Sequence, residues 1–289
     1  MPRSLAMPTA SREHLPWLIA LAGFALMFGP VYWNAATGIW QTDDNAHGPI
    51  IALVLLYLFW SVWRDIVGAE ERPLPSLGWP LFGLGLLMYV FGRAFNISSV
   101  EFAAQLPVVA AALLLIKGPA ALRAAWFPVF YLVFMIPLPG SLVDAVTGPL
   151  KQWISDIVEA ILWHAGYPIS RSGVVLQIGQ YQLLVADACS GLHSMFSLSA
   201  LGTLFMYLMA RRSRLHNVIM LAAILPVAFI ANIVRVIVLV LVTYHLGDEA
   251  GQGFLHDTAG IVLMIVALCI LFLVDALLRL VLRERPARA

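Results

Sequence analysis

Eight apolar stretches divide this sequence, and they constrain its fold more than any other feature. They lie at about 17–33, 49–63, 79–95, 102–116, 124–138, 189–209, 218–246 and 257–280. A helix crosses about 30 Å of hydrocarbon with about 20 apolar residues, and most of these stretches approach that length. Because 61% of the residues are hydrophobic and only 11% are charged, a soluble fold is excluded. We predict an all-α polytopic membrane protein with about eight transmembrane helices, forming a single integral-membrane domain over residues 1–289.

The basic residues set the orientation of these helices. With the N-terminus inside, only Lys151 and Arg171 fall in outer segments, and Arg93 and Arg235 fall inside apolar stretches. The other 13 of the 17 Lys and Arg residues fall in inner segments. Cytoplasmic segments of membrane proteins are enriched in these residues. We therefore predict that both termini are cytoplasmic and that the long segment 139–187 lies outside.

The first half of the outer insertion at about 139–187 repeats apolar residues at helical spacing. They are Leu142, Val146, Leu150, Trp153, Ile157 and Ile161. Charged residues fall between them, at Asp144, Lys151, Asp156 and Glu159. This pattern predicts an amphipathic helix on the outer membrane face, which Gly148-Pro149 could interrupt and restart.

The second half of the insertion has the pattern of β-structure. VVLQI and YQLLVAD are separated by Gly179-Gln180, which predicts a hairpin with a Gly-first, two-residue turn. The hairpin leads directly to Cys189. It could therefore form a lip over that residue and offer a strand edge to an extended peptide.

Cys189 stands at the start of the sixth apolar stretch, within DACSGLHSM. Ser190 and Gly191 keep the space around it small, and the positive end of a helix dipole favours a thiolate over a thiol. The alternative is that Cys189 is simply a small apolar residue of a membrane helix. Cys269, in the last apolar stretch, is interpreted as a packing residue, and two such cysteines do not suggest a disulfide.

Two further residues stand out at the same predicted depth. Arg235 lies in NIVRVIVLVLV, in the outer half of the bilayer, where insertion of a guanidinium costs roughly 2.5–3.5 kcal/mol. His256 ends the outer loop GDEAGQGFLHD at the start of the last stretch. The alternatives are an arginine that snorkels to lipid headgroups and a histidine that caps a helix or lies on the surface. The predicted topology brings Cys189, Arg235 and His256 to one outer layer.

These three residue types suit acyl transfer by a thiol. A thiolate attacks a peptide carbonyl, a histidine moves the proton, and a fixed cation stabilises the developing negative charge. His193, four residues after Cys189, and His245, on the Arg235 helix, are alternative proton carriers. A metal site fits less well, because the sequence has no paired cysteines, no HExxH and no histidine pair beside carboxylates. Phosphate-binding and dinucleotide-binding motifs are also absent, so we predict no metal and no cofactor.

The first outer segment contains TDDNAHG. Asp43, Asp44 and His47 either form an acidic N-cap region before the second helix or belong to the site. We include His47 among the residues that support the site or bind substrate. The others are Asp187, Ser190, Gly191, His193 and Asn232.

Several long motifs of this sequence resemble those of one protein family. They are HGPIIALVLLYLFW, IPLPGSLVDAVTGPLKQWIS, GYPISRSGVVLQIGQYQLLVADACSGL, the NIVRV helix and the segment around His256. With them the chain resembles the exosortases and their archaeal relatives, the archaeosortases, over most of its length. ACSG in this setting is the most specific part of the resemblance. The resemblance implies that Cys189, Arg235 and His256 are the catalytic residues.

The resemblance also implies an activity, that of a membrane-embedded cysteine protease and transpeptidase of the bacterial inner (plasma) membrane. Its partners would be the lipid bilayer and exported proteins with a PEP-CTERM-type signal: a short Pro-Glu-Pro-type motif, one transmembrane helix and a basic tail. A net charge of +1 without a dense basic cluster gives no indication of nucleic acid binding.

Two alternatives stay open. One is an intramembrane thiol protease without a transfer step. The other, from a different class, is a transporter or channel, which would explain eight spans and an intramembrane arginine. It would leave the cysteine at a helix start and the outer hairpin unexplained, and the sequence lacks the duplicated hydropathy halves of many transporters.

Overall fold

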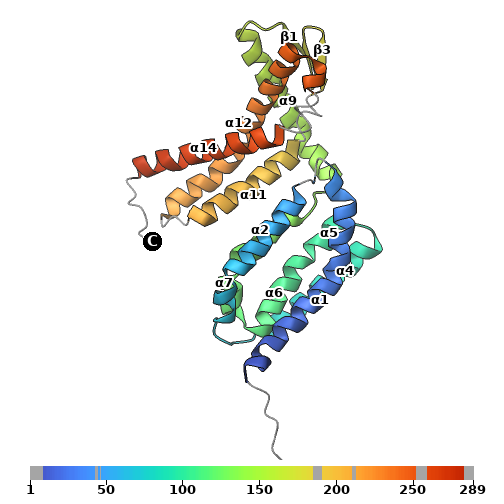
Figure 1. The fold of residues 1–289 in the computed structure, drawn as a ribbon, viewed down its shortest axis with the longest axis vertical. Coiled ribbons are helices and arrows are strands. Elements are labelled where there is room, and N and C mark those ends of the chain that lie inside the picture. The colour runs from blue at the N-terminus through green and yellow to red at the C-terminus, as the bar shows by residue number, and fades with distance from the viewer. Residues whose placement is uncertain are drawn as a thin grey trace, which may run out of the picture. The chain divides into compact units, whose positions relative to one another are not determined.

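The computed structural model of this chain is mostly helical and describes residues 9–42, 45, 47–184, 191–209, 213–251 and 259–282. It divides into two compact units, Met1–Leu138 and Pro139–Ala289 (Figure 1). The boundary falls where the predicted outer insertion begins. Because each unit is compact by itself, the single domain over residues 1–289 stays a prediction.

The first unit consists of helices joined by short connections. Its longer helices are α1 (Thr9–Thr37), α2 (Gly48–Ser61), α4 (Pro75–Ala94) and α6 (Gln105–Ile116). Its shorter ones are η1 (Ile39–Gln41), α3 (Trp63–Val67), α5 (Ser98–Ala103), α7 (Pro119–Ala124), α8 (Trp126–Tyr131) and η3 (Leu132–Met135). Prolines stand in the first turn of α2, α4 and α7, where the missing N–H removes no helix hydrogen bond. They mark where these helices begin.

Three glycines spaced by seven residues line the face of α4 that packs on α5 and α6. They are Gly78, Gly85 and Gly92, and all three are buried. A Cβ added at any of them would come within 2.6 Å of an atom on a partner helix, in Leu115, Val108 and Glu101 respectively. The partner positions step backward as the glycines step forward, so the helices run antiparallel. Close approach over small residues is a common way for membrane helices to pack.

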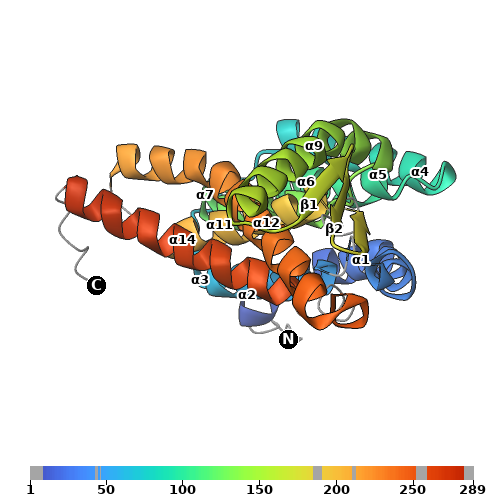
Figure 2. The same cartoon turned by 90° about the horizontal axis from the view of Figure 1, so that it is seen from above.

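The second unit combines long helices with a small sheet. Its elements are α9 (Gly140–His164), β1 (Ile169–Ser172), β2 (Val175–Ile178), β3 (Tyr181–Leu184), α11 (Gly191–Met209), α12 (Arg214–Leu246) and α14 (Ala259–Val281). The first half of α12 packs with α11 and α14 through an apolar cluster that includes Phe205, Ile224 and Leu271. Its second half packs with α9 and the sheet through a cluster that includes Val236 and Val240 (Figure 2). α12 therefore connects the helical part of this unit to the sheet.

The strands form an antiparallel sheet in the order β1-β2-β3. Ile178 pairs with Tyr181 across Gly179-Gln180, so the predicted hairpin is confirmed. Gly179 has a φ of 56°, the positive value that a Gly-first turn requires. β1 was not predicted. It joins β2 through a second two-residue turn, at Gly173 with a φ of 64°, and its sequence ISRS is too short and polar to show a strand pattern.

α9 confirms a helix in the first half of the insertion, but with two differences from the prediction. The helix continues through Pro149, so Gly148-Pro149 does not restart it. Its buried residues include Ile154 and Val158, which pack on the sheet and α12. In the predicted apolar stripe, by contrast, Trp153 is 60% exposed and Ile161 is 46% exposed. The packed face therefore includes Leu150 of the predicted stripe but not Trp153 or Ile161, and the place of the stripe on a membrane surface stays a prediction.

Five helices are long and apolar enough to cross a membrane. They are Leu15–Gln41, Pro75–Ala94, Ser98–Ile116, Leu215–Leu246 and Met264–Val281. The other three predicted spans correspond to shorter apolar helices in the described part of the chain, at Gly48–Ser61, Trp126–Met135 and Phe196–Met209. The 14 residues of Gly48–Ser61 rise only about 21 Å, which is less than a bilayer core. A multi-pass membrane protein is confirmed, and the number of eight spans stays a prediction.

Candidate active site

The candidate site is centred on Arg235, which lies between the two apolar clusters of α12. Ala228 and Ala231 belong to the cluster with α11 and α14, and Val236 belongs to the cluster with α9 and the sheet. Arg235 is 7% exposed, and Asn232, three residues earlier on the same helix face, is fully buried. This burial disagrees with the alternative that the Arg235 side chain snorkels outward to lipid headgroups. A buried cation and a buried amide thus share one level of the unit.

The packing of α11 against α12 shows what lies level with Arg235. The two helices are joined by residues 210–213 and run antiparallel. They meet at Gly202, where an added Cβ would lie 2.9 Å from Cγ1 of Ile224. Eleven residues before Gly202 on α11 is Gly191, and eleven residues after Ile224 on α12 is Arg235. Since both helices rise 1.5 Å per residue, the first residue of α11 lies at the level of Arg235.

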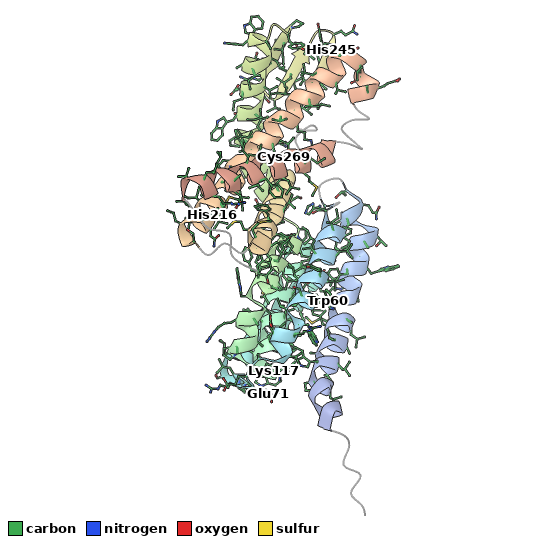
Figure 3. The ribbon with its side chains drawn as sticks, turned by 60° about the vertical axis from the view of Figure 1, so that its left-hand side comes forward. Trp60, Glu71, Lys117, His216, His245 and Cys269 are labelled. Atoms are coloured by element: carbon green, nitrogen blue, oxygen red, sulfur yellow. The ribbon has the colours of Figure 1, made fainter. Side chains whose placement is uncertain are left out.

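The packing of α14 gives a second, independent register. Nε2 of His216, which is labelled in Figure 3, lies 3.0 Å from Oδ1 of Asp275, and both side chains are buried. Sixteen residues after His216 on α12 is Asn232, and sixteen residues before Asp275 on α14 is Ala259, the first described residue of that helix. The start of α14 therefore also lies within one helical turn of Arg235.

A ring contact between α11 and α14 agrees with both registers. The rings of Phe205 and Phe272 lie 5.0 Å apart between centroids. Thirteen residues back along each helix lead to Leu192 and Ala259. The three helices thus bring the start of α11, the start of α14 and Arg235 to one level.

His245 does not share this level. It is ten residues beyond Arg235 on α12, or about 15 Å along the helix axis, and it is exposed. Its Nε2 lies 3.3 Å from the hydroxyl of Tyr167, and its ring contacts Tyr244 edge-on. His245 therefore connects the end of α12 to the loop after α9, which fits a proton carrier at Arg235 poorly.

Comparison with protein families identifies the chain. Residues 39–273 match the family described as transmembrane exosortase. The chain belongs to the exosortase family. No curated protein and no solved structure matches it. The matched region runs from η1 of the first unit into α14 of the second, so it includes elements of both units of this exosortase.

The sequence-predicted site residues of this exosortase fall into three groups. Asn232 and Arg235 lie together on α12. Gly191 begins α11 and His193 lies in its first turn, with the backbone described at both positions. Outside the described residues lie Asp43, Asp44, Asp187, Cys189, Ser190 and His256. The grouping of Cys189, Arg235 and His256 in one site stays a prediction.

His47 belongs to the first unit and stands at the N-cap position of α2, where its side chain makes no capping hydrogen bond. Arg235 belongs to the second unit. The predicted role of His47 in supporting the site therefore stays a prediction.

Cys269 corrects one interpretation. It is exposed on α14 and not packed inside the unit (Figure 3). On a membrane helix an apolar residue is stable when it faces lipid, so hydropathy did not distinguish the two positions. Its role as a packing residue was therefore wrong.

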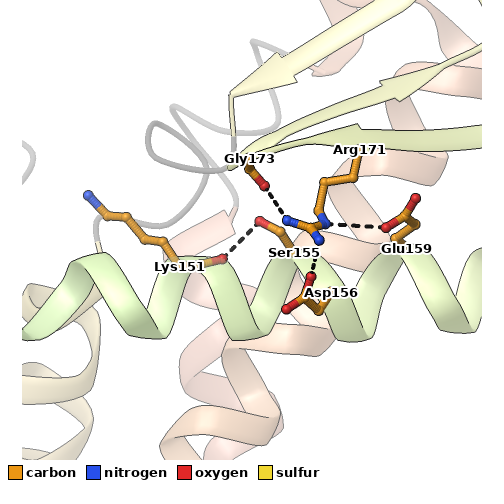
Figure 4. A network of polar contacts seen from close by, with 6 residues as sticks. All are labelled: Lys151, Ser155, Asp156, Glu159, Arg171 and Gly173. Carbon is orange, nitrogen blue, oxygen red and sulfur yellow. Dashed lines mark hydrogen bonds and ion pairs between the residues drawn. The ribbon is translucent and has the colours of Figure 1, made fainter.

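Arg171 is a structural residue that was not predicted. From β1 it donates to Oε2 of Glu159 at 3.2 Å and to the carbonyl oxygen of Gly173 at 2.8 Å, and it forms an ion pair with Asp156 (Figure 4). The acidic partners stand one turn apart on α9, three residues from each other. The only available signal was the acidic residues at helical spacing. Arg171 therefore links the sheet to α9.

Within the described residues no group of three or more His, Cys, Asp or Glu is arranged to hold a metal ion.

Proposed function

We propose that this protein is a membrane cysteine transpeptidase that cleaves the C-terminal sorting signals of exported proteins. Membership of the exosortase family supports a protein that processes sorting signals in a membrane. The observation that carries the proposal for this chain is the common level of Arg235 and the starts of α11 and α14. These are the places to which the predicted nucleophile and proton carrier are attached.

Chain connectivity brings the predicted catalytic residues near this level. Cys189 is two residues before Gly191, so their Cα atoms are at most roughly 8 Å apart. His256 is three residues before Ala259, a span of at most roughly 11 Å. Both residues are therefore tethered close to the level of Arg235, which supports one shared site.

The chemistry follows from these three residues. The thiolate of Cys189, favoured by the N-terminus of the following helix, attacks the carbonyl carbon of the scissile peptide bond. Arg235 stabilises the oxyanion, and its burial strengthens this interaction because little water competes. His256 donates a proton to the departing amine, leaving a thioester on Cys189. An incoming nucleophile then loses its proton to His256 and attacks the carbonyl carbon of the thioester; the C–S bond breaks, the acyl group passes to the nucleophile, and the Cys189 thiolate is restored.

The remaining predicted residues support this arrangement. Ser190 and Gly191 leave room for the substrate beside the thiol, and Asn232 places an amide one turn from Arg235. Asp187, His193 and His47 are proposed to orient the substrate or the catalytic groups.

The proposed substrates match the predicted topology. With both termini cytoplasmic, the site faces the outside of the bacterial inner membrane. A basic tail holds a substrate helix with its C-terminus inside, and this places a short motif before the helix at the outer interface. The bilayer itself would thus align the Pro-Glu-Pro-type motif with Cys189.

The test is whether processing depends on Cys189. We expect Cys189→Ala to abolish processing of a tagged substrate, so that full-length substrate accumulates in the membrane. Cys269→Ala is the matched control and is expected to process normally, because Cys269 is exposed on α14. Processing by Cys189→Ala at the normal rate would end the proposal and reopen the transporter or channel alternative.

A second measurement separates transfer from hydrolysis. The new C-terminus of a processed substrate, read by mass spectrometry, is expected to carry an added group. A free carboxylate would instead support the alternative of an intramembrane thiol protease without a transfer step.

A further inference from the structure

The sheet of the second unit has an open edge at β3. In a hairpin with a two-residue turn, the pair beside the turn is hydrogen-bonded, and the following pairs alternate. Ile178 and Tyr181 are the pair beside the turn, so Tyr181 and Leu183 bond to β2. The N–H and C=O groups of Gln182 and Leu184 therefore point away from the sheet, and no described residue pairs with them as a further strand.

The two faces of β3 differ in burial. Leu183 is 8% exposed and packs in the cluster formed with α9 and α12, which holds β3 in place. Gln182 is exposed and Leu184 is 40% exposed. β3 therefore combines a fixed inner face and an exposed outer face with an edge on which the described residues place no further strand.

The opposite edge of the sheet differs. There β1 packs beside α9, and its Arg171 forms an ion pair with Asp156 of that helix. The N–H of Ile169, one of the outward groups of β1, already donates to the carbonyl oxygen of Tyr167 at 2.9 Å. β3 is thus the better edge for an added strand.

We infer that β3 binds the extended substrate segment next to the scissile bond as an added strand, through the main-chain groups of Gln182 and Leu184. This inference rests on the proposed function and names the docking surface of that same site. Leu184 is five residues before Cys189, a span of at most about 18 Å. A segment of similar length that pairs with β3 would carry its next carbonyl toward the thiol.

The chemistry of the proposed motif fits an edge strand. In Pro-Glu-Pro only the central residue has an N–H, and neighbouring residues of a strand present their main-chain groups to opposite sides. Glu can therefore pair with β3 while both prolines point their nitrogens outward. Proline is tolerated at such an outward position and not inside a sheet. The motif can add one strand, and its free side cannot extend the sheet further.

The first experiment maps the contact. A substrate peptide with a photoreactive residue next to its Pro-Glu-Pro-type motif is bound to full-length Cys189→Ala protein in lipid nanodiscs, illuminated and analysed by mass spectrometry. We expect cross-links within residues 181–184. Cross-links confined to other elements would overturn the inference.

The second experiment removes one main-chain donor. Gln182→Pro deletes the outward N–H without removing a bond to β2, and we expect about a five- to tenfold lower rate of processing at limiting substrate. Gln182→Ala keeps the N–H and is expected to keep the cross-link. Gln177 is the cross-strand partner of Gln182 on β2. Gln177→Ala is the side-chain control and is expected to process normally.

The outcomes separate this inference from the proposed function. If Gln182→Pro processes normally while Cys189→Ala is inactive, the strand docking is wrong and the proposed function stands. If Cys189→Ala processes normally, the proposed function itself fails. A proline variant that does not fold is recognised by loss of Cys189 alkylation, and the cross-linking of the unaltered strand then decides.

Discussion

At the scale of single residues, the burial of Arg235 defines what its side chain can do. A guanidinium offers a planar fork of donors, whereas an ammonium is a compact point charge. If Arg235 stabilises an oxyanion, Arg235→Lys should lower the processing rate at least about tenfold while the protein still accumulates in membranes. Pulse-labelling of a tagged substrate measures this rate.

A matched control is available in the first unit. Nη1 of Arg93 lies 3.1 Å from Oε1 of Glu101, in an ion pair between α4 and α5. Arg93→Lys keeps this charge and is expected to process normally. A fully active Arg235→Lys would indicate that charge alone matters, and an active Arg235→Ala would exclude Arg235 from the reaction.

The proton carrier is the second question at this scale. We expect His256→Ala to form no product, because the departing amine then receives no proton. His193→Ala should lower activity only through packing, and His245→Ala should remain active because His245 lies about 15 Å along α12 from Arg235. Added imidazole should partly restore His256→Ala in a time-course assay. If His193→Ala is inactive and His256→Ala is active, His256 is not the proton carrier.

At the scale of elements, the glycine face of α4 sets how closely it packs on α5. A Cβ at Gly92 would lie 2.6 Å from the backbone nitrogen of Glu101, which cannot move aside as a flexible side chain could. We expect Gly92→Ala to cost about 1–3 kcal/mol and to lower the melting temperature in detergent by several degrees. Gly83→Ala is the control, since nothing lies within 4 Å of an added Cβ there. Equal melting temperatures for the two variants would contradict this packing.

The buried contact between His216 and Asp275 links α12 to α14. Breaking a buried pair leaves one polar group without its partner, so Asp275→Leu or His216→Leu alone should cost about 3–5 kcal/mol. The double variant should recover most of this loss, because both desolvated groups are then gone. Unfolding of all four proteins in detergent forms a double-mutant cycle. Purely additive effects would mean that the two residues do not act as a pair.

At the scale of the whole molecule, the predicted orientation can be tested directly. In a background of Cys189→Ala and Cys269→Ala, Gln152→Cys on α9 should react with a membrane-impermeant maleimide in intact cells stripped of their outer membrane. Glu70→Cys should react only after the inner membrane is permeabilised. Both positions are exposed in their units, so access depends on the side of the membrane. The reverse pattern would place both termini outside and the site in the cytoplasm.

The sequence by itself determined the features that depend on local chemistry. Hydropathy alone indicates a multi-pass membrane protein, because apolar helices are stable in lipid whatever their neighbours are. The turn between β2 and β3 was predictable because Gly179 accepts a positive φ that other residues avoid. The site residues followed from predicted depth and from motif resemblance. Of these, the structure describes Arg235, Asn232 and His47 with their burial, and the grouping of Arg235 with Cys189 and His256 stays a prediction.

Only the tertiary structure decided the features that depend on partners distant in the sequence. Trp153 and Ile154 are both apolar neighbours on α9, and the sheet and α12 determine that Ile154 is the buried one. β1 is stabilised by its pairing with β2 and by the contacts of its Arg171 with Asp156 and Glu159 on α9, and its own sequence reveals neither set of partners. The common level of Arg235 and the starts of α11 and α14 likewise arises from contacts between helices. Packing is a property of pairs of surfaces, and a single sequence pattern specifies only one surface of each pair.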